Sequence, residues 1–282
     1  MKVFLTGNKG KIGRVLEPHL RNLGYEVVGY DLVDGRDVLD PVSIETAIGG
    51  CESVIHLAAS LGGPQETPQD IMQVNVQGTW NILTCAAHAS VSRVVYMSSV
   101  NALGVFMGEA KPVYLPLDDE HPCSPTGSYG ISKLLAEEMC RLWSNSIGLP
   151  VICLRPPGVW TKNTYHEIVA ARKADPLFEW EPFWEYGAFI DIRDLAQATA
   201  RALTCPCEEF VRLLIASTDI TTSGKTSREL AQKIHPDVEW RGGREFDDDP
   251  FRSLLNTNSA QNMLGWTPEY TWRRFLKKSD PG

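Results

Sequence analysis

The chain has 282 residues, 43% hydrophobic and 22% charged, so it can bury a large core as an ordinary globular protein. Its formal net charge of −8 comes without a basic run, which argues against a nucleic-acid partner. Seven scattered cysteines without a C-x-x-C pair favour buried thiols over a metal site. No apolar stretch is long enough for a signal peptide or a membrane span, so we expect a cytoplasmic protein without a membrane partner.

The first apolar run, residues 2–5, predicts a buried strand that a glycine loop and a helix follow. This order is typical of a dinucleotide-binding turn, in which backbone N–H groups approach a pyrophosphate at the start of the helix. The spacing G-x-x-G-x-x-G differs from G-x-G-x-x-G, and a plain glycine-rich turn is the alternative. The candidate cofactor residues of this loop are Gly7, Asn8, Lys9, Gly10, Lys11, Ile12 and Gly13.

The second apolar run, residues 25–30, ends in Asp31, whose carboxylate can accept hydrogen bonds from both hydroxyls of a ribose. An acid at this place favours NAD over NADP, because it would repel a 2′-phosphate. Arg36 would partly offset that repulsion, and a solvated aspartate at a strand end is the alternative. We interpret Asp37-Val38 as a short strand edge and Asp40-Pro41 as the start of a helix.

Three further apolar runs, at residues 53–59, 93–97 and 150–154, alternate with predicted helices, which implies a parallel α/β sheet. One of these helices spans residues 67–89 and carries Asn75 on its apolar stripe. Ligands of such sheets bind beyond the carboxyl ends of the strands. The residues placed there are Gly7, Asp31, Ala58, Ser99 and Pro156, whereas His56 fits packed core better than catalysis.

The alternation weakens after Gly158, where an aromatic segment at residues 179–186 could cover a pocket. Strands at 187–190 and 210–216 and helices at 191–203, 227–234 and 257–264 follow. We interpret the acidic run Asp247-Asp248-Asp249 as a solvated loop without a metal.

Tyr129 and Lys133 lie four residues apart at the start of a predicted helix, so the phenol and the ammonium share one face. A cation held close to a phenol lowers the pKa of the phenol and makes it a usable base. Ser99, at the tip of the preceding strand, is placed to reach that phenol. A surface helix with a solvated lysine is the alternative for this pattern alone.

Together these motifs, with Leu154-Arg155-Pro156, residues 189–195 and residues 264–268, resemble the extended short-chain dehydrogenase/reductase family, which includes NAD-dependent epimerases and dehydratases. The resemblance covers nearly the whole chain. It implies a Rossmann-type doubly wound parallel sheet in an NAD-binding domain (1–158) and a smaller C-terminal substrate-binding part (159–282). Residues 187–204 are expected to pack back on the first domain.

The resemblance also implies roles for individual residues. Ser99, Tyr129 and Lys133 would be catalytic, with Asn75 supporting a proton path and Ser98 as a less favoured alternative to Ser99. NAD would be held by the glycine loop and by Asp31, Asp37, Val38, Leu57, Ala58, Ala59, Tyr129, Lys133, Pro156 and Gly158.

Departures from the family pattern bear on the substrate. Val100-Asn101 follow Ser99 where sugar-nucleotide dehydratases have an acidic pair, so elimination of water lacks its proton donors. Residues 184–188 contain no arginine to clamp a diphosphate. We therefore expect an NAD-dependent dehydrogenase of a small polar secondary alcohol, a sugar or sugar acid. The alternatives are an NAD-containing sugar-nucleotide epimerase and, less favoured, a cofactor-sensing binding protein.

Substrate contacts are hypotheses for Ser99, Asn101, Trp160, Asn163 and Arg252. For Arg252, a surface salt bridge is the alternative. The resemblance further suggests a homodimer through helices near 67–89 and 127–147, although their apolar stripes could simply belong to the core.

Overall fold

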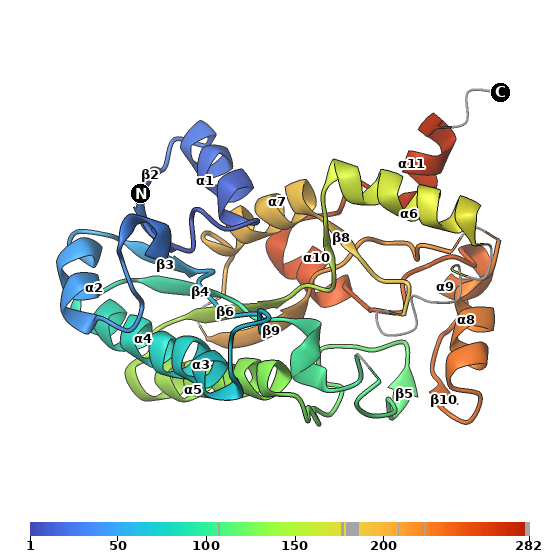
Figure 1. Ribbon diagram of the computed structural model, residues 1–282, viewed down its shortest axis with the longest axis horizontal. Coiled ribbons are helices and arrows are strands. Elements are labelled where there is room, and N and C mark those ends of the chain that lie inside the picture. Colours follow the sequence, from blue (N-terminus) through green and yellow to red (C-terminus); the bar gives the residue numbers. More distant parts are fainter. Residues whose placement is uncertain (107, 176–177, 179–185, 208, 223, 280–282) are drawn as a thin grey trace.

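The computed structural model describes residues 1–106, 108–175, 178, 186–207, 209–222 and 224–279 (Figure 1). Its centre is a six-stranded parallel sheet with the strand order β2-β1-β3-β4-β6-β9. Because β2 and β3 lie on opposite sides of β1, the end of β1 is the switch point where a ligand crevice forms. The strands are β1 (Lys2–Thr6), β2 (Glu26–Tyr30), β3 (Ser53–His56), β4 (Arg93–Met97), β6 (Val151–Arg155) and β9 (Phe210–Leu214).

Helices cover both faces of this sheet, which confirms the predicted doubly wound α/β class (Figure 1). Successive strand residues point to opposite faces, so Leu5 packs on one layer and Phe4 on the other. The first layer contains α1 (Gly13–Asn22), α7 (Ile192–Ala202) and α10 (Asn258–Leu264). The second contains α2 (Pro41–Ile48), α4 (Gly78–His88) and α5 (Ser128–Ile147).

The remaining elements lie near the carboxyl ends of the strands or belong to the C-terminal half of the chain. Two short parallel pairs form there, β5 (Tyr114–Leu115) with β10 (Glu239–Trp240) and β7 (Val159–Trp160) with β8 (Ile190–Asp191). The other helices are η1 (Leu32–Asp34), α3 (Pro68–Met72), the π-helix η2 (Gln73–Gln77), η3 (Val100–Leu103), α6 (Lys162–Ala174), α8 (Ser227–Ile234), α9 (Glu245–Asp248) and α11 (Trp272–Ser279). None of the helices in the described part is long and apolar enough to cross a membrane.

Several local predictions need correction. The expected single helix over 67–89 consists of α3, η2 and α4 in succession. Asp37-Val38 is not a strand, because the chain turns there before the Asp40 side chain caps α2 by accepting from the N–H groups of Val42 and Ser43. The predicted acidic loop contributes Asp247 and Asp248 to α9, and the predicted strand at 187–190 is reduced to the two residues of β8.

Two predictions about the rest of the chain have different outcomes. The cysteines of the chain are free thiols, and all except Cys123 are buried, as predicted. Of the segment expected to cover a pocket, residues 179–185 lie outside the described residues. Tyr186 is buried, and its hydroxyl donates to the Val105 carbonyl at 2.9 Å.

Candidate active site

The glycine loop between β1 and α1 is built for close backbone approach. Gly7 has φ +69°, and a Cβ atom on it would lie 2.8 Å from the Ala58 nitrogen. A Cβ atom on Gly13 would lie 2.3 Å from the Gly7 carbonyl oxygen, so both positions require glycine. The first turn of α1 therefore lies against the loop, where its N–H groups can face an anion.

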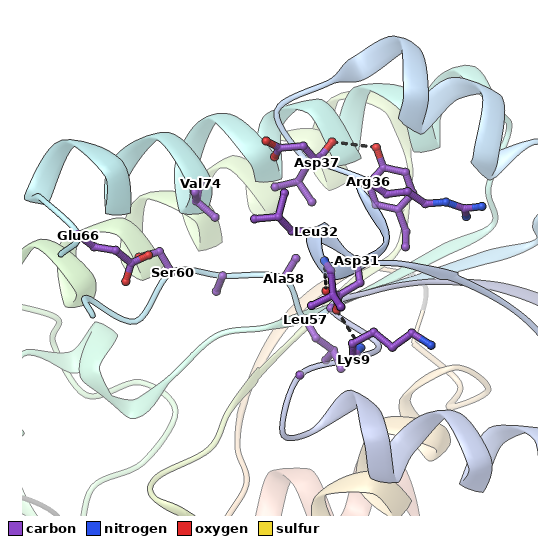
Figure 2. Close-up of a pocket in the computed structure, with 16 residues that line it drawn as sticks. Lys9, Asp31, Leu32, Arg36, Asp37, Leu57, Ala58, Ser60, Glu66 and Val74 are labelled. Carbon is purple, nitrogen blue, oxygen red and sulfur yellow. Dashed lines mark hydrogen bonds between the residues drawn. The ribbon is translucent and has the colours of Figure 1, made fainter. Parts of the chain in front are cut away.

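A cavity of about 350 Å³ opens beside this loop at the switch point of the sheet (Figure 2). Backbone of the loop forms one side of it, and the end of β3 with the π-helix forms another. The residues around it suit a nucleotide with a diphosphate, because they combine a glycine-rich cradle with one carboxylate at the ribose position. Predicted cofactor residues among those that line it are Gly7, Lys9, Gly10, Asp31, Asp37, Val38, Leu57, Ala58 and Ala59.

Asp31 is held in place within this cavity by two backbone donors. One carboxylate oxygen accepts from the Lys9 N–H at 2.8 Å, and the other accepts from the Val33 N–H at 3.0 Å (Figure 2). Arg36 lines the same cavity, and its guanidinium donates to the Gly29 carbonyl at 2.9 Å. Asp31 and Arg36, the two charged residues expected to affect the preference for NAD over NADP, therefore line the same cavity.

Three predicted catalytic side chains meet at the start of α5. Lys133 is buried, and its ammonium donates to the Met97 carbonyl at the end of β4 at 2.8 Å. The same nitrogen lies 5.8 Å from the centre of the Tyr129 ring. The Ser99 side chain lies close enough to the Tyr129 phenol to lower the pKa of that phenol. The structure therefore gathers Ser99, Tyr129 and Lys133 beyond the carboxyl end of β4.

The electrostatics of this trio differ from the expectation. Burial raises the pKa of Tyr129 above its usual value, and the neighbouring Ser99 side chain opposes that rise. Burial also lowers the pKa of Lys133 to about 8, against the raising effect of the Glu137 carboxylate. In this structure the pKa of Tyr129 is therefore raised and not lowered as predicted, because desolvation of the phenol is the largest effect.

Asn75 positions backbone rather than reaching the phenol directly. Its amide nitrogen donates to the Ser60 carbonyl and to the Ser132 hydroxyl, both at 2.9 Å, and its oxygen accepts from the Ser60 N–H at 2.8 Å. These three bonds tie the π-helix to α5 and to the wall of the dinucleotide cavity, of which Ser60 is part. Its predicted part in a proton path stays a prediction.

A buried chain of hydrogen bonds runs from the cavity wall to that π-helix through His56. The Ala58 N–H donates to the Thr6 hydroxyl, which bonds to His56 Nδ1 at 2.7 Å. His56 Nε2 bonds to the Thr79 hydroxyl at 3.1 Å, and that hydroxyl donates to the Asn75 carbonyl. Thr79 can then only accept from the ring, so Nε2 carries the proton. Burial lowers the pKa of His56 to about 3, so the ring is neutral, in agreement with its predicted core role.

A buried ion pair behind Lys133 was not indicated as part of the site by the sequence patterns. The Arg155 guanidinium donates to both oxygens of Glu137, at 2.8 and 2.5 Å, and neither side chain is exposed. The Ser98 hydroxyl donates to the same carboxylate at 2.5 Å. Glu137 lies four residues after Lys133 and thus on the same helix face, which is the one signal that would have pointed to it.

The predicted substrate residues other than Ser99 have different surroundings. Trp160 is packed against Phe189 and Trp272, and Asn163 is exposed on α6. Arg252 donates to Asn258 at 3.1 Å and lines a separate cavity of about 100 Å³. Asn101 follows Ser99 in η3, and its N–H donates to the Ser99 hydroxyl at 3.2 Å, so it alone of these four lies near the trio.

Pro156 and Gly158 lie at the end of β6. The Pro156 carbonyl accepts from the Val100 N–H at 3.1 Å, and the Gly158 carbonyl accepts from the Ile190 N–H at 3.0 Å. The β7 carbonyl of Val159 accepts from the Lys11 ammonium of the glycine loop at 2.6 Å. The segment after β6 is therefore anchored both to the Ser99 turn and to the dinucleotide loop.

Comparisons with known proteins agree with this geometry. A putative UDP-glucose 4-epimerase of Methanocaldococcus jannaschii is 28% identical over 97% of this chain and 86% of its own. The structure of a short-chain dehydrogenase/reductase superfamily protein from Agrobacterium tumefaciens with bound NAD matches with a TM-score of 0.71 and 21% identity, covering 99% of this chain and 96% of that one. A structure titled mutated uronate dehydrogenase matches with a TM-score of 0.65 and 18% identity over 98% and 84%. A family model matches residues 3–210, and the chain therefore belongs to the NAD dependent epimerase/dehydratase family.

Proposed function

We propose that this enzyme oxidises a secondary alcohol of a carbohydrate-like substrate, a free sugar or sugar acid. Its family is NAD dependent, and NAD is its cofactor. The observation that carries the proposal is the meeting of Ser99, Tyr129 and Lys133 beyond the carboxyl end of β4. A phenol, a hydroxyl and a buried ammonium in one place are what alcohol oxidation needs from a protein.

Each of the three residues has a separate task. Ser99 donates a hydrogen bond to the substrate oxygen, and Tyr129 takes the alcohol proton as a phenolate, which the positive charges of Lys133 and of a bound nicotinamide would favour over the phenol. Lys133 supplies positive charge near the phenol and holds the nicotinamide ribose. NAD, held by the glycine loop and Asp31, would supply the hydride acceptor, so that the alcohol would leave as a carbonyl compound. The proton and the hydride together account for the two-electron oxidation.

The cofactor is proposed to lie across the switch point of the sheet. Its pyrophosphate meets the glycine loop from Gly7 to Gly13, and its adenosine ribose meets Asp31. Adenine lies near Asp37 and Val38, which line the cavity. The nicotinamide end reaches the turn of Pro156 and Gly158. NADP is disfavoured by the fixed Asp31 carboxylate.

A free sugar or sugar acid is favoured over a sugar nucleotide by the segment before β8. Residues 175–189 contain no arginine or lysine to hold a diphosphate. A mutated uronate dehydrogenase is among the structures that share the fold.

A second candidate, epimerisation of a sugar nucleotide, is favoured by a different observation. The Methanocaldococcus jannaschii protein that matches along 97% of this chain carries the name of a putative UDP-glucose 4-epimerase. The same trio would perform the first half of that reaction, because epimerisation also begins with oxidation of an alcohol. The hydride then returns to the opposite face of the sugar.

Net release of NADH separates the two candidates. The purified enzyme is incubated with NAD and panels of free sugars, sugar acids and UDP-sugars, and the absorbance of NADH is followed. A dehydrogenase accumulates NADH in step with its product, whereas an epimerase converts its sugar without net reduction. Accumulation with no member of the panel, together with conversion of a UDP-sugar, would replace the first candidate by the second.

We further propose that the chain forms a homodimer through α4 and α5. Large apolar side chains of these helices face solvent: Trp80 is 48% exposed, Leu135 42%, Leu142 54% and Ile147 49%. Trp80 also contacts Trp143 across the two helices, with ring centres 5.7 Å apart. Such a patch is typical of an interface between proteins. Placement in the cytoplasm stays a prediction.

A further inference from the structure

A second cavity, of about 310 Å³, lies between α6, the first turn of α7 and α11. It shares no lining residue with the dinucleotide cavity. In Figure 1, α6 and α11 lie together at the upper right, on the other side of α7 from α1. Its size falls at the lower end of the range of small-molecule sites. The cavity is therefore a place for a ligand other than the cofactor.

Aromatic side chains form the walls of this cavity and are held rigidly. Tyr165 lies 4.9 Å from Phe275 between ring centres, and its hydroxyl donates to the buried Asp191 carboxylate at 3.1 Å. Asp191 also receives two hydrogen bonds from the Arg193 guanidinium, at 2.8 and 2.7 Å. That guanidinium lies 3.4 Å from the centre of the Tyr270 ring. One buried carboxylate thus holds both Tyr165 and Arg193, two residues of the cavity lining.

Positive charge surrounds these walls. Besides Arg193, which Asp191 neutralises, the lining contains Lys162, Arg274 and Lys278. Arg274 donates to a backbone carbonyl, that of Glu269, and within the described residues no carboxylate lies at ion-pair distance from Lys162, Arg274 or Lys278. The lining itself includes no aspartate or glutamate. Three cations that pair with no carboxylate of the described part thus surround one cavity, in a chain of net charge −8.

The combination selects one class of ligand. Flat aromatic walls favour a planar ring, which stacks on them or meets them edge to face. Cations at the same cavity favour an anionic group on that ring, since the ammonium and guanidinium groups donate charge-assisted hydrogen bonds. We propose that this cavity binds a small aromatic anion, a single ring that carries a carboxylate or a phosphate, at the same time as the cofactor is bound elsewhere.

Titration calorimetry on the full chain, saturated with NAD, tests the proposal. The two probes are benzoate and phenyl phosphate, and they distinguish a carboxylate from a phosphate as the anionic group. Phenol and inorganic phosphate each supply one half of the chemistry. We expect at least one aromatic anion to bind roughly tenfold or more tightly than phenol and inorganic phosphate do. Phenol lacks the contacts of the anionic group, and inorganic phosphate lacks those of the ring.

Matched variants locate the binding. Arg274→Met and Lys278→Met should each weaken the bound probe by roughly tenfold, the usual scale for a hydrogen bond to a charged group. Lys277→Met removes an equal charge from an exposed neighbour that does not line the cavity, so its effect should stay within about twofold. Unfolding temperatures show that each variant is folded.

Three results would overturn the proposal. They are absence of heat with both aromatic anions, equal affinity for inorganic phosphate, and equal losses in Lys277→Met and the two lining variants. None of these results depends on which sugar the enzyme oxidises, so the proposed reaction is tested separately.

Discussion

Glu137 and Arg155 form an ion pair in which neither side chain is exposed to solvent, and Glu137 lies on the helix face that carries Lys133. The pair joins α5 to the end of β6, and the Ser98 hydroxyl adds the end of β4 to the same carboxylate. The positions of Ser99 and Lys133 thus depend on a charge that never meets substrate. Glu137 also acts on Lys133 electrostatically, because its carboxylate raises the pKa of that ammonium group.

Glu137→Gln should be strongly destabilising, because it leaves the Arg155 charge buried without its partner. We expect a loss of about 3–5 kcal/mol in the free energy of unfolding. The matched control is Glu138→Gln, whose carboxylate pairs with Arg141 and Arg212 while 38% exposed, and its cost should stay under about 1 kcal/mol. Urea denaturation of both variants gives the comparison. Equal losses would mean that the buried pair is not a structural anchor.

Asp31→Asn should narrow the preference for NAD over NADP. The variant removes both the charge-assisted bond to the ribose and the repulsion of a 2′-phosphate, so the ratio of the two affinities should fall roughly tenfold or more. Asp34→Asn is the control, because Asp34 pairs with the Lys9 ammonium at 3.9 Å but does not line the cavity. Binding of both cofactors is measured by calorimetry. An unchanged ratio in Asp31→Asn would remove Asp31 from cofactor selection.

His56 should make the native protein sensitive to acid. Its pKa is about 3 in the folded protein and near 6.5 when unfolded, so below pH 6.5 the unfolded chain binds a proton that the folded chain refuses. Stability is therefore lost as the pH falls. Between pH 7 and 5 the parent should lose about 2 kcal/mol more than His56→Gln.

Two carboxylates act in the opposite direction. Burial raises the pKa of Asp119 and of Asp194 to about 6, so the folded protein takes up their protons first and gains stability as the pH falls toward 4. Parent and variant share these groups, and the difference between their urea curves at the two pH values isolates the histidine. Parallel losses in both proteins would contradict the neutral, buried ring.

The proposed dimer is tested by placing a charge in its apolar patch. Leu142→Glu on α5 should convert a sedimenting dimer into a monomer at micromolar concentration, since an interface cannot bury an unpaired carboxylate cheaply. Val113→Glu changes an apolar residue that is 56% exposed but lies outside α4 and α5, and it should leave the dimer intact. A monomeric parent protein would end the proposal.

The sequence predicts the sheet of this protein better than its surroundings. Buried parallel strands are continuous apolar runs, so β1, β3, β4 and β6 were found within a few residues, and Asp40 was recognised because an N-cap acts locally. The sequence does not predict the helix α11, because its apolar side chains pack on Tyr165 and Phe189, which come from distant segments of the chain. The π-helix around Asn75 was missed because a π-turn leaves no periodic signature.

The same division holds for the site. Gly7, Asp31, Tyr129 and Lys133 follow from spacing, since each rule joins residues close in sequence. The electrostatic surroundings did not follow. Burial of Tyr129, which raises its pKa, depends on packing from several elements, and only the folded chain brings Arg155 to Glu137.

The central claim, that Tyr129 takes the proton of the substrate alcohol, is tested most directly by Tyr129→Phe. The variant keeps the half-buried ring and deletes only the hydroxyl beside Ser99. The measurement is kcat on the substrate that the parent oxidises, with NAD binding to the variant verified by calorimetry. We predict a fall in kcat of roughly 10²-fold or more with NAD still bound. Near-parental kcat in a folded, NAD-binding Tyr129→Phe protein would contradict the mechanism.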